Sequence, residues 1–176
     1  SLKPPPSMDE MKYDMHGSAT VFGLFVALYE SGYTGRVNGI TCMAENMPSA
    51  GAYRPGDVIN TYSGKTIEVL NTDAEGRVIL ADGLSYASKH YDPEYILDFA
   101  TLTGAVVISL GHIATGVMGT NDELMKKVKD SSSASGEKVW ELPLWPEYCK
   151  QVQSEIADVK NTGAPMQAGS IAGGAF

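Results

Sequence analysis

A periodic run of apolar side chains near the start of the sequence predicts a helix over residues 17–31. Apolar side chains recur there at three- and four-residue spacing and so share one helical face: Val21, Phe22, Leu24, Phe25 and Leu28. Gly32 follows at the position where glycine commonly ends a helix. Prolines occupy positions 4–6 before this run and disfavour a helix there.

Further along, short apolar runs that favour strands alternate with longer periodic runs that favour helices. Residues 57–61 and 66–70 predict a hairpin that turns at Ser63-Gly64. Thr120 and Glu123 form a predicted capping box at the start of a helix, where Glu123 also pairs with Lys127. Elsewhere we expect strands over 36–42, 95–100 and 115–118 and helices over 78–89 and 146–156. Residues 105–110 suit either a helix or a strand. The Gly- and Ala-rich residues 161–174 offer no side chain large enough to fill a core.

The alternation of strands and helices predicts an α/β fold with a mixed, largely parallel β-sheet. The 176 residues suit one domain, and the sequence contains neither an internal repeat nor a domain linker. No apolar run approaches the roughly 20 residues of a membrane-spanning helix, so we expect no membrane partner.

The amino-acid composition and the net charge exclude or disfavour several classes of protein. Hydrophobic residues make up 43% of the chain and charged residues 19%, which excludes a disordered protein. The net charge of −8 argues against nucleic-acid binding through electrostatic attraction. Two cysteines, Cys42 and Cys149, are too few for a disulfide framework, so we expect a reduced, cytoplasmic compartment.

The segment with the clearest chemistry is Asn-Thr-Asp-Ala-Glu-Gly-Arg at residues 71–77. In extended backbone, side chains two residues apart point the same way, so Asp73, Glu75 and Arg77 would share a face after a strand. Two carboxylates about 4 Å apart repel by roughly 4 kcal/mol at an effective dielectric of about 20. A shared proton, a cationic side chain or a metal ion would relieve that repulsion. The alternative is a solvated loop in which Arg77 pairs with one acid.

Two other segments add candidate site residues. Asp14 precedes a helix, where an acid serves either as an N-cap or as a metal ligand. Lys3 is either part of a site or a solvated lysine near the chain end. Residues 100–105 are small and hydroxyl-bearing, and they either line a substrate pocket or start a helix. The sequence contains no Gly-x-Ser-x-Gly elbow and no phosphate-binding loop, and its scattered histidines form no metal motif: His16, His90 and His112.

The heptapeptide NTDAEGR closely resembles the signature of the leucine aminopeptidase family, also called the cytosol aminopeptidases. Other stretches resemble the family in the same order and spacing: SLKPPPSMDEMKYDM, ENMPSAGAYRPGDVI, SGKTIEVL, DFATLTGA and ISLGHIATGVM. The resemblance covers most of the chain. It implies a zinc-exopeptidase-like catalytic domain, with helices on both faces of the sheet, that is truncated at both ends.

The resemblance implies two divalent metal ions, Zn²⁺ or Mn²⁺ with Mg²⁺ or Co²⁺ as alternatives, and a bicarbonate ion. Asp14, Asp73 and Glu75 match metal ligands. Lys3 matches the lysine that polarises the scissile carbonyl or stabilises the tetrahedral intermediate, and Arg77 matches the arginine that holds bicarbonate as general base. The positions matching the pocket for the first side chain of the substrate are Met11, Thr101, Leu102 and Gly104.

The family also uses a lysine and an aspartate in a segment of the form GKGxTFDSGG, upstream of the match to residues 1–3. Two of the five protein metal ligands are therefore absent from these 176 residues. We interpret the chain as a partial C-terminal catalytic domain, without the N-terminal domain, and expect it alone to bind metal weakly and to hydrolyse peptides poorly or not at all. The intact protein is expected to act on peptides as a homohexamer. The alternative is a noncatalytic oligomeric or DNA-binding protein that keeps the fold.

Overall fold

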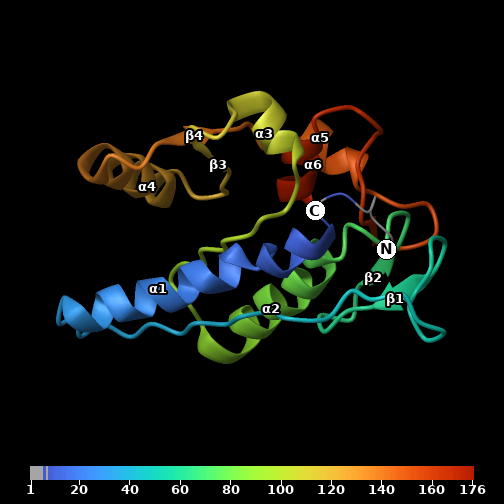
Figure 1. Ribbon diagram of the computed structural model, residues 1–176, viewed down its shortest axis with the longest axis horizontal. Helices are drawn as coiled ribbons and strands as arrows, with labels where there is room; N and C mark the ends of the chain where they lie inside the picture. Colours follow the sequence, from blue (N-terminus) through green and yellow to red (C-terminus); the bar gives the residue numbers. More distant parts are fainter. Residues whose placement is uncertain (1–5, 7) are drawn as a thin grey trace.

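The computed structural model describes residue 6 and residues 8–176. The helices are the 3₁₀ helix η1 (Met8–Tyr13), α1 (His16–Glu30), α2 (Gly76–Tyr91), α3 (Ala105–Leu110), α4 (Asp122–Ser135), α5 (Pro146–Gln151) and α6 (Gly169–Ala175). The strands are β1 (Val58–Asn60), β2 (Thr66–Glu68), β3 (Thr115–Val117), β4 (Val139–Glu141) and β5 (Val159–Lys160). Figure 1 shows α1, α2 and the β1–β2 hairpin on one side of the molecule, with α3, β3, β4, α4, α5 and α6 on the other.

The strands form two small sheets. In the first sheet, β2 lies between β1, which is antiparallel to it, and β5, which is parallel to it. The second sheet pairs β3 and β4 in parallel. The mixed α/β class predicted from the sequence is therefore confirmed, with the described strands divided between two sheets.

Turn chemistry predicts the β1–β2 hairpin correctly. Val58 faces Glu68 and Asn60 faces Thr66 in the antiparallel register. Gly64 has a φ of +86°, a conformation that strongly favours glycine, and its amide donates to the Thr61 carbonyl. The hairpin thus brings the end of β2, and the polar segment that follows it, to a fixed place beside β1.

Helix α1 confirms the predicted helix, but the strand predicted over residues 36–42 is wrong. Within the described part of the chain, no backbone hydrogen bond reaches this segment, so it lacks the partner that a strand needs. The segment nevertheless lies between two helices. Gly39 contacts the Phe25 ring of α1, and the Cys42 thiol lies against Gly83 of α2. Phe22, which the apolar spacing grouped with Phe25 on one face of this helix, is 60% exposed.

The region from residue 92 to residue 118 differs from the sequence prediction in one place and confirms it in another. Residues 95–100 form no strand, and no backbone hydrogen bond from the other described residues supports one there. The ambiguous residues 105–110 are helical, as α3. The predicted strand over residues 115–118 is confirmed as β3.

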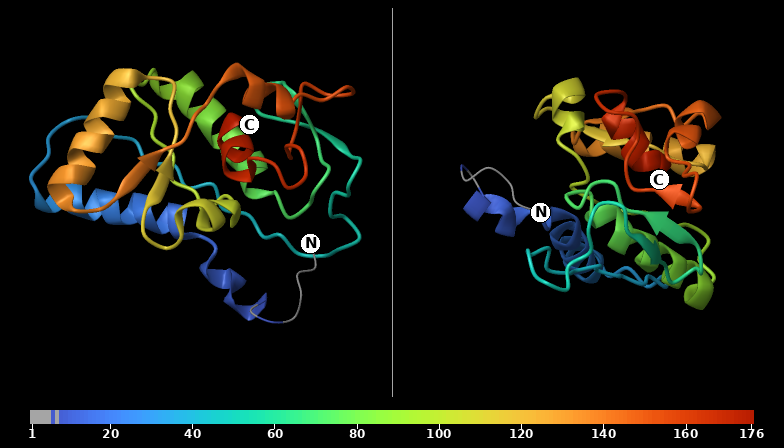
Figure 2. Two further views of the ribbon diagram at one scale, coloured as in Figure 1. Left: turned by 90° about the horizontal axis from the view of Figure 1, so that it is seen from above. Right: turned by 90° about the vertical axis from the view of Figure 1, so that its right-hand side faces the viewer.

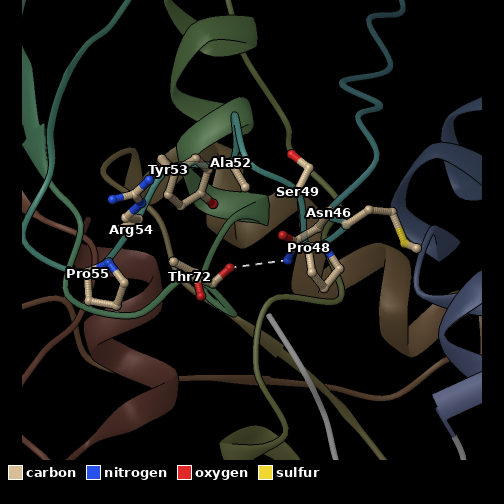
Figure 3. Close-up of a pocket in the computed structure, with 9 residues that line it drawn as sticks. Asn46, Pro48, Ser49, Ala52, Tyr53, Arg54, Pro55 and Thr72 are labelled. Atoms are coloured by element: carbon tan, nitrogen blue, oxygen red, sulfur yellow. Dashed lines mark hydrogen bonds between the residues drawn. The ribbon is translucent and has the colours of Figure 1, made fainter.

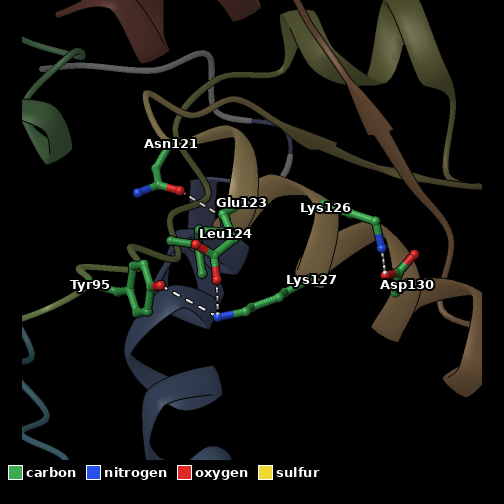
Figure 4. A network of polar contacts seen from close by, with 7 residues as sticks. All are labelled: Tyr95, Asn121, Glu123, Leu124, Lys126, Lys127 and Asp130. Atoms are coloured by element: carbon green, nitrogen blue, oxygen red, sulfur yellow. Dashed lines mark hydrogen bonds and ion pairs between the residues drawn. The ribbon is translucent and has the colours of Figure 1, made fainter.

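The start of α4 differs from the predicted capping box. Asn121 is the N-cap, and its Oδ1 accepts a 2.9 Å hydrogen bond from the Leu124 amide. Glu123 does not bond back to Thr120, because its carboxylate forms the predicted ion pair with Lys127 at 2.8 Å, which is confirmed (Figure 4). The Lys127 ammonium also lies 3.4 Å from the Tyr95 hydroxyl, so the network links α4 to the irregular segment before α3.

The C-terminal third contains three elements that the sequence analysis missed, β4, β5 and α6, and one that it overextended, α5. Helix α5 ends at Gln151 rather than near residue 156, because Gln153 pairs with Val159 in a β-bridge that leads into β5. Residues 161–174 are predicted to contain no side chain large enough to fill a core. Helix α6 nevertheless buries three of its small residues, Ser170, Ala172 and Gly173. Small side chains let this helix approach its neighbours closely, and Figure 2 shows it over the start of α2.

The best-buried apolar side chains are few: Ile67, Val69, Met125, Val152 and Ala172. Ile67 and Val69 come from β2 and the residue just after it, so the first sheet lies at the centre of the packing. Among the described helices, none is long and apolar enough to cross a membrane.

Candidate active site

The polar segment 71–77 connects β2 to α2, at the carboxyl end of a strand that pairs in parallel with β5. In open α/β sheets this end is the usual place for ligand sites. The extended arrangement predicted for Asp73, Glu75 and Arg77 is wrong. Glu75 is the N-cap of α2 with helical dihedral angles (φ −78°, ψ −34°), and Arg77 already belongs to the first helical turn. The helix begins two residues earlier than the apolar periodicity indicated.

Arg77 and one carboxylate oxygen of Glu75 are buried in this segment. Arg77 is only 8% exposed, and its Nε donates no hydrogen bond to any described residue. The Glu75 Oε2 is also buried and accepts no hydrogen bond from the described residues. Burial lowers the pKa of the Arg77 guanidinium, and the negative charge of Glu75 opposes that shift. The solvated-loop interpretation is therefore wrong for Arg77, which is enclosed by protein.

Asp14 lies between η1 and α1 and is bonded to a distant segment. The N-cap of α1 is Met15, which makes no side-chain capping bond, so the N-cap interpretation of Asp14 is wrong. Instead, Asp14 Oδ1 accepts a 2.6 Å hydrogen bond from the Thr101 hydroxyl. The structure thus joins a predicted metal ligand to a predicted substrate-binding residue. Met11, whose carbonyl accepts from the Asp14 amide, is 39% exposed.

The segment 101–104 reaches Arg77 through α6. A Cβ atom placed on Gly173 would lie 3.0 Å from Leu102 Cδ2 and 3.5 Å from Arg77 Nη2. The missing side chain of Gly173 therefore lets α6 cover both residues. Gly104, which is exposed, is the N-cap of α3. Two predicted site residues, Arg77 and Leu102, are in this way packed against the same part of α6.

Asn161 is a site residue that sequence reasoning missed. Its side chain is 0% exposed and bonds to both ends of the segment that carries Asp73 and Glu75. Residues 161–174 show no local pattern that would single it out, because its partners are 87 to 91 residues earlier in the chain.

A surface cavity of about 280 Å³ opens beside the same segment (Figure 3). Thr72 lines it from one side, and its carbonyl accepts a 3.2 Å hydrogen bond from Asn46 Nδ2. Tyr53 also lines the cavity, and its hydroxyl is buried without a hydrogen bond to the described residues. Burial raises the pKa of the Tyr53 hydroxyl, and the charge of Glu75 raises it further. The Tyr53 hydroxyl therefore lies close enough to the Glu75 carboxylate to interact with its charge.

The donor chemistry of the segment suits a divalent cation. Asp14, Asp73 and Glu75 offer hard oxygen atoms, and no described residue donates to the buried Glu75 Oε2, which a cation would complete. Across the residues that the structure describes, however, no group of three His, Cys, Asp or Glu side chains is close enough to hold a metal ion. Lys3 lies outside the described residues. The metal assignments thus stay predictions.

Comparison with known proteins identifies the family. The sequence model for the cytosol aminopeptidase family, catalytic domain, matches residues 1–176. A probable cytosol aminopeptidase of Syntrophotalea carbinolica is 52% identical over 176 residues, which are all of this chain and 35% of that protein. Proteins with the same name from Tolumonas auensis and Cenarchaeum symbiosum are 51% and 47% identical over all of this chain, and it covers 35% and 36% of them. The chain spans about a third of the length of these curated relatives. With a family match over its full length, the chain belongs to the cytosol aminopeptidase family and carries sequence of its catalytic domain.

Proposed function

We propose that this chain is part of a metal-dependent aminopeptidase that releases N-terminal amino acids, with a leucine-type preference, from peptides. The observation that carries the proposal is the Glu75 carboxylate oxygen at the start of α2, which is buried without a hydrogen-bond partner among the described residues, in a chain of this family. An unpaired buried carboxylate oxygen is costly unless a proton or a cation completes it. A bound cation would serve that purpose.

Asp14, Asp73 and Glu75 are the residues of this chain that would hold two divalent ions, Zn²⁺ or Mn²⁺, with Mg²⁺ or Co²⁺ as alternatives. When bound, such ions make a water molecule nucleophilic at neutral pH and polarise the scissile carbonyl. The Thr101 hydroxyl fixes one oxygen of Asp14 and leaves Oδ2 for a ligand role. We assign Lys3 the role of stabilising negative charge on the substrate carbonyl oxygen.

Arg77 suits the binding of a small anion such as bicarbonate, which would act as general base. Its guanidinium is buried, and its Nε donates no hydrogen bond to a described residue. An oxyanion offers a planar pair of acceptors that match the guanidinium fork. Both the charge and the unpaired donor of Arg77 would then be satisfied, which supports this role.

The substrate would be recognised by the residues that surround Asp14 and α6. We propose that Met11, Thr101, Leu102 and Gly104 line the pocket for its first side chain. Leu102 provides apolar surface next to Gly173, and Met11 has a flexible side chain that adapts to different apolar residues. We further propose that the intact protein is a cytosolic homohexamer.

We propose that the 176 residues alone bind metal weakly and turn over peptides poorly, because they contain three of the five expected protein ligands. The test is the metal content of the purified chain after incubation with Mn²⁺ or Zn²⁺, measured by elemental mass spectrometry. The expected content is far below two ions per chain. Two ions per chain, lost in Asp73→Ala, would contradict this expectation and show that the site is complete.

The aminopeptidase proposal itself is tested in the full-length protein with leucyl peptides. Glu75→Gln keeps the size of the side chain but removes the charge, and we expect at least a hundredfold loss of kcat/KM together with lost metal. The matched control is Glu147→Gln, which makes the same change on exposed α5. Wild-type full-length protein that releases no N-terminal residue in the presence of Mn²⁺ or Zn²⁺ would refute the proposal.

A further inference from the structure

Where the parallel pairing of β2 with β5 ends, a side chain replaces the backbone as the hydrogen-bonding partner of the chain after β2. Ile67 and Glu68 pair with Val159 and Lys160, and the Asn161 amide then donates a 3.0 Å hydrogen bond to the Glu68 carbonyl. Beyond this point the backbone of β2 bends into the segment 71–75. There, backbone N–H and C=O groups of residues 70, 71 and 74 form hydrogen bonds with the Asn161 side chain and not with a neighbouring strand.

The Asn161 side chain uses its whole hydrogen-bonding capacity on this segment. Its Oδ1 accepts from the Leu70 amide at 2.9 Å and from the Asn71 amide at 3.2 Å. Its Nδ2 donates to the Asn71 carbonyl at 2.6 Å and to the Ala74 carbonyl at 3.2 Å. An asparagine side chain has two lone pairs and two N–H groups, so all four are satisfied.

The bonds lie on both sides of Asp73 and end at the residue directly before Glu75. Leu70 and Asn71 lie before Asp73, and Ala74 lies between Asp73 and Glu75. The bond to the Ala74 carbonyl therefore fixes the backbone unit that joins the two acids. Because Asn161 is 0% exposed, bulk water does not compete with these bonds.

We propose that Asn161 is a positioning residue that sets the spacing of the Asp73 and Glu75 carboxylates for metal binding. The metal part of this proposal rests on the proposed function, whereas the shaping of segment 70–74 stands on the hydrogen bonds alone. Residues that hold metal ligands in place, without touching the metal, typically change metal affinity 10- to 100-fold when they are substituted.

The informative substitution is Asn161→Asp, which keeps the shape and both acceptor positions but removes both donors. The carbonyls of Asn71 and Ala74 then face a carboxylate oxygen instead of an N–H group. Asn161→Ala removes all four bonds and serves as the stronger variant. The control is Asn121→Asp, because the Asn121 side-chain oxygen accepts the capping bond of α4 and aspartate caps helices equally well.

The first measurement is hydrogen exchange of single amides in the full-length protein without added metal. In Asn161→Ala, we expect the Leu70 and Asn71 amides to exchange at least tenfold faster. The Val69 amide, which donates to the Asp57 carbonyl, should keep its rate. Unchanged exchange at Leu70 and Asn71, or equally faster exchange at Val69, would overturn the proposed shaping of the segment.

The second measurement is Mn²⁺ affinity of the full-length protein by titration calorimetry. We expect the Kd to rise 10- to 100-fold in Asn161→Asp and to stay within twofold in Asn121→Asp. An unchanged Kd in Asn161→Asp would overturn the positioning role. Wild-type protein that binds no Mn²⁺ or Zn²⁺ would instead refute the proposed function and the metal role of Asn161 together. The exchange measurement would still decide whether Asn161 shapes the segment.

Discussion

The Thr101 hydroxyl donates a 2.6 Å hydrogen bond to Asp14 Oδ1 and joins two segments that are 87 residues apart in the sequence. Nearby, Gly17 on the first turn of α1 lies against the Phe99 carbonyl. The start of α1 and the segment before α3 are therefore held together by one polar bond and one close backbone approach. Both contacts can be removed separately by substitution.

Substituting Thr101 by valine should lower the free energy of unfolding by about 0.5–1 kcal/mol, because it removes the donor to Asp14 at a surface-exposed bond. Thr101→Ser keeps a hydroxyl group and should stay within about 0.5 kcal/mol of wild type. Urea unfolding followed by circular dichroism measures both. Equal stability of the valine and serine variants would show that the bond contributes nothing.

Two glycines on the same helix should respond to alanine in opposite ways. At Gly17, a Cβ atom would lie 2.0 Å from the Phe99 carbonyl oxygen, so Gly17→Ala must push two backbones apart and should cost about 1–3 kcal/mol. At Gly23, no atom of the described residues lies within 4 Å of the Cβ position, and alanine should stabilise the helix by about 0.5–1 kcal/mol. Thermal unfolding of the two variants checks this. A stabilised Gly17→Ala variant would contradict the contact.

Local chemistry explains which parts of the fold the sequence could predict. The β1–β2 hairpin and the end of α1 depend on glycines in the left-handed region, Gly64 and Gly32, and both were identified from neighbouring residues. Residues 36–42 have the composition of a strand but lack a partner among the described residues. Amino-acid composition indicates that a segment favours a strand, but it does not indicate whether another strand lies beside it, so this prediction was wrong.

The candidate site shows the same division. The motif at 71–77 identified Asp73, Glu75 and Arg77, yet it placed Arg77 in an extended chain, while the helix starts at Gly76. The burial of Arg77 depends on α6, a helix of small residues that carries little periodic apolar pattern. The burial of Arg77 therefore results from contacts between residues far apart in the sequence, which local patterns do not reveal.

Asp158 should make part of the stability of the first sheet dependent on pH. The Thr66 amide and hydroxyl donate to Asp158 Oδ2 at 2.7 and 2.8 Å, and they hold the pKa of this carboxyl below its usual range. Since the folded protein favours the charged form, this contribution is present above the usual pKa of aspartate and is lost as pH falls through the lowered value.

Asp158→Asn should accordingly be less stable than wild type at pH 7, and the difference should shrink as the pH falls to about 2. Thermal unfolding midpoints of both proteins across this range measure the difference. A gap between the two proteins that stays constant from neutral to acidic pH would rule out the ionised carboxylate as its source.

The Cys42 thiol should react slowly with alkylating reagents at neutral pH. Burial raises its pKa, a hydrogen bond with the Gly83 backbone partly offsets this, and the charge of Asp82 raises it again. A raised pKa leaves less thiolate, which is the reactive form. Iodoacetamide labelling of a Cys149→Ser variant, followed by mass spectrometry, should be slower in the folded protein than in urea and should accelerate as the pH rises above 8. Equal rates at pH 7 would contradict the shielding of Cys42.

The bond between Asn161 and the Asn71 carbonyl spans 90 residues, and this separation has a consequence for how the protein is made. At a synthesis rate of about 5–20 residues per second, Asn161 leaves the ribosome roughly 5 to 18 seconds after Asn71. During that interval the segment with Asp73 and Glu75 is already outside the ribosome but lacks the side chain that gives it its shape. We therefore expect the two acids to reach their native spacing only after the chain has closed a loop of this length.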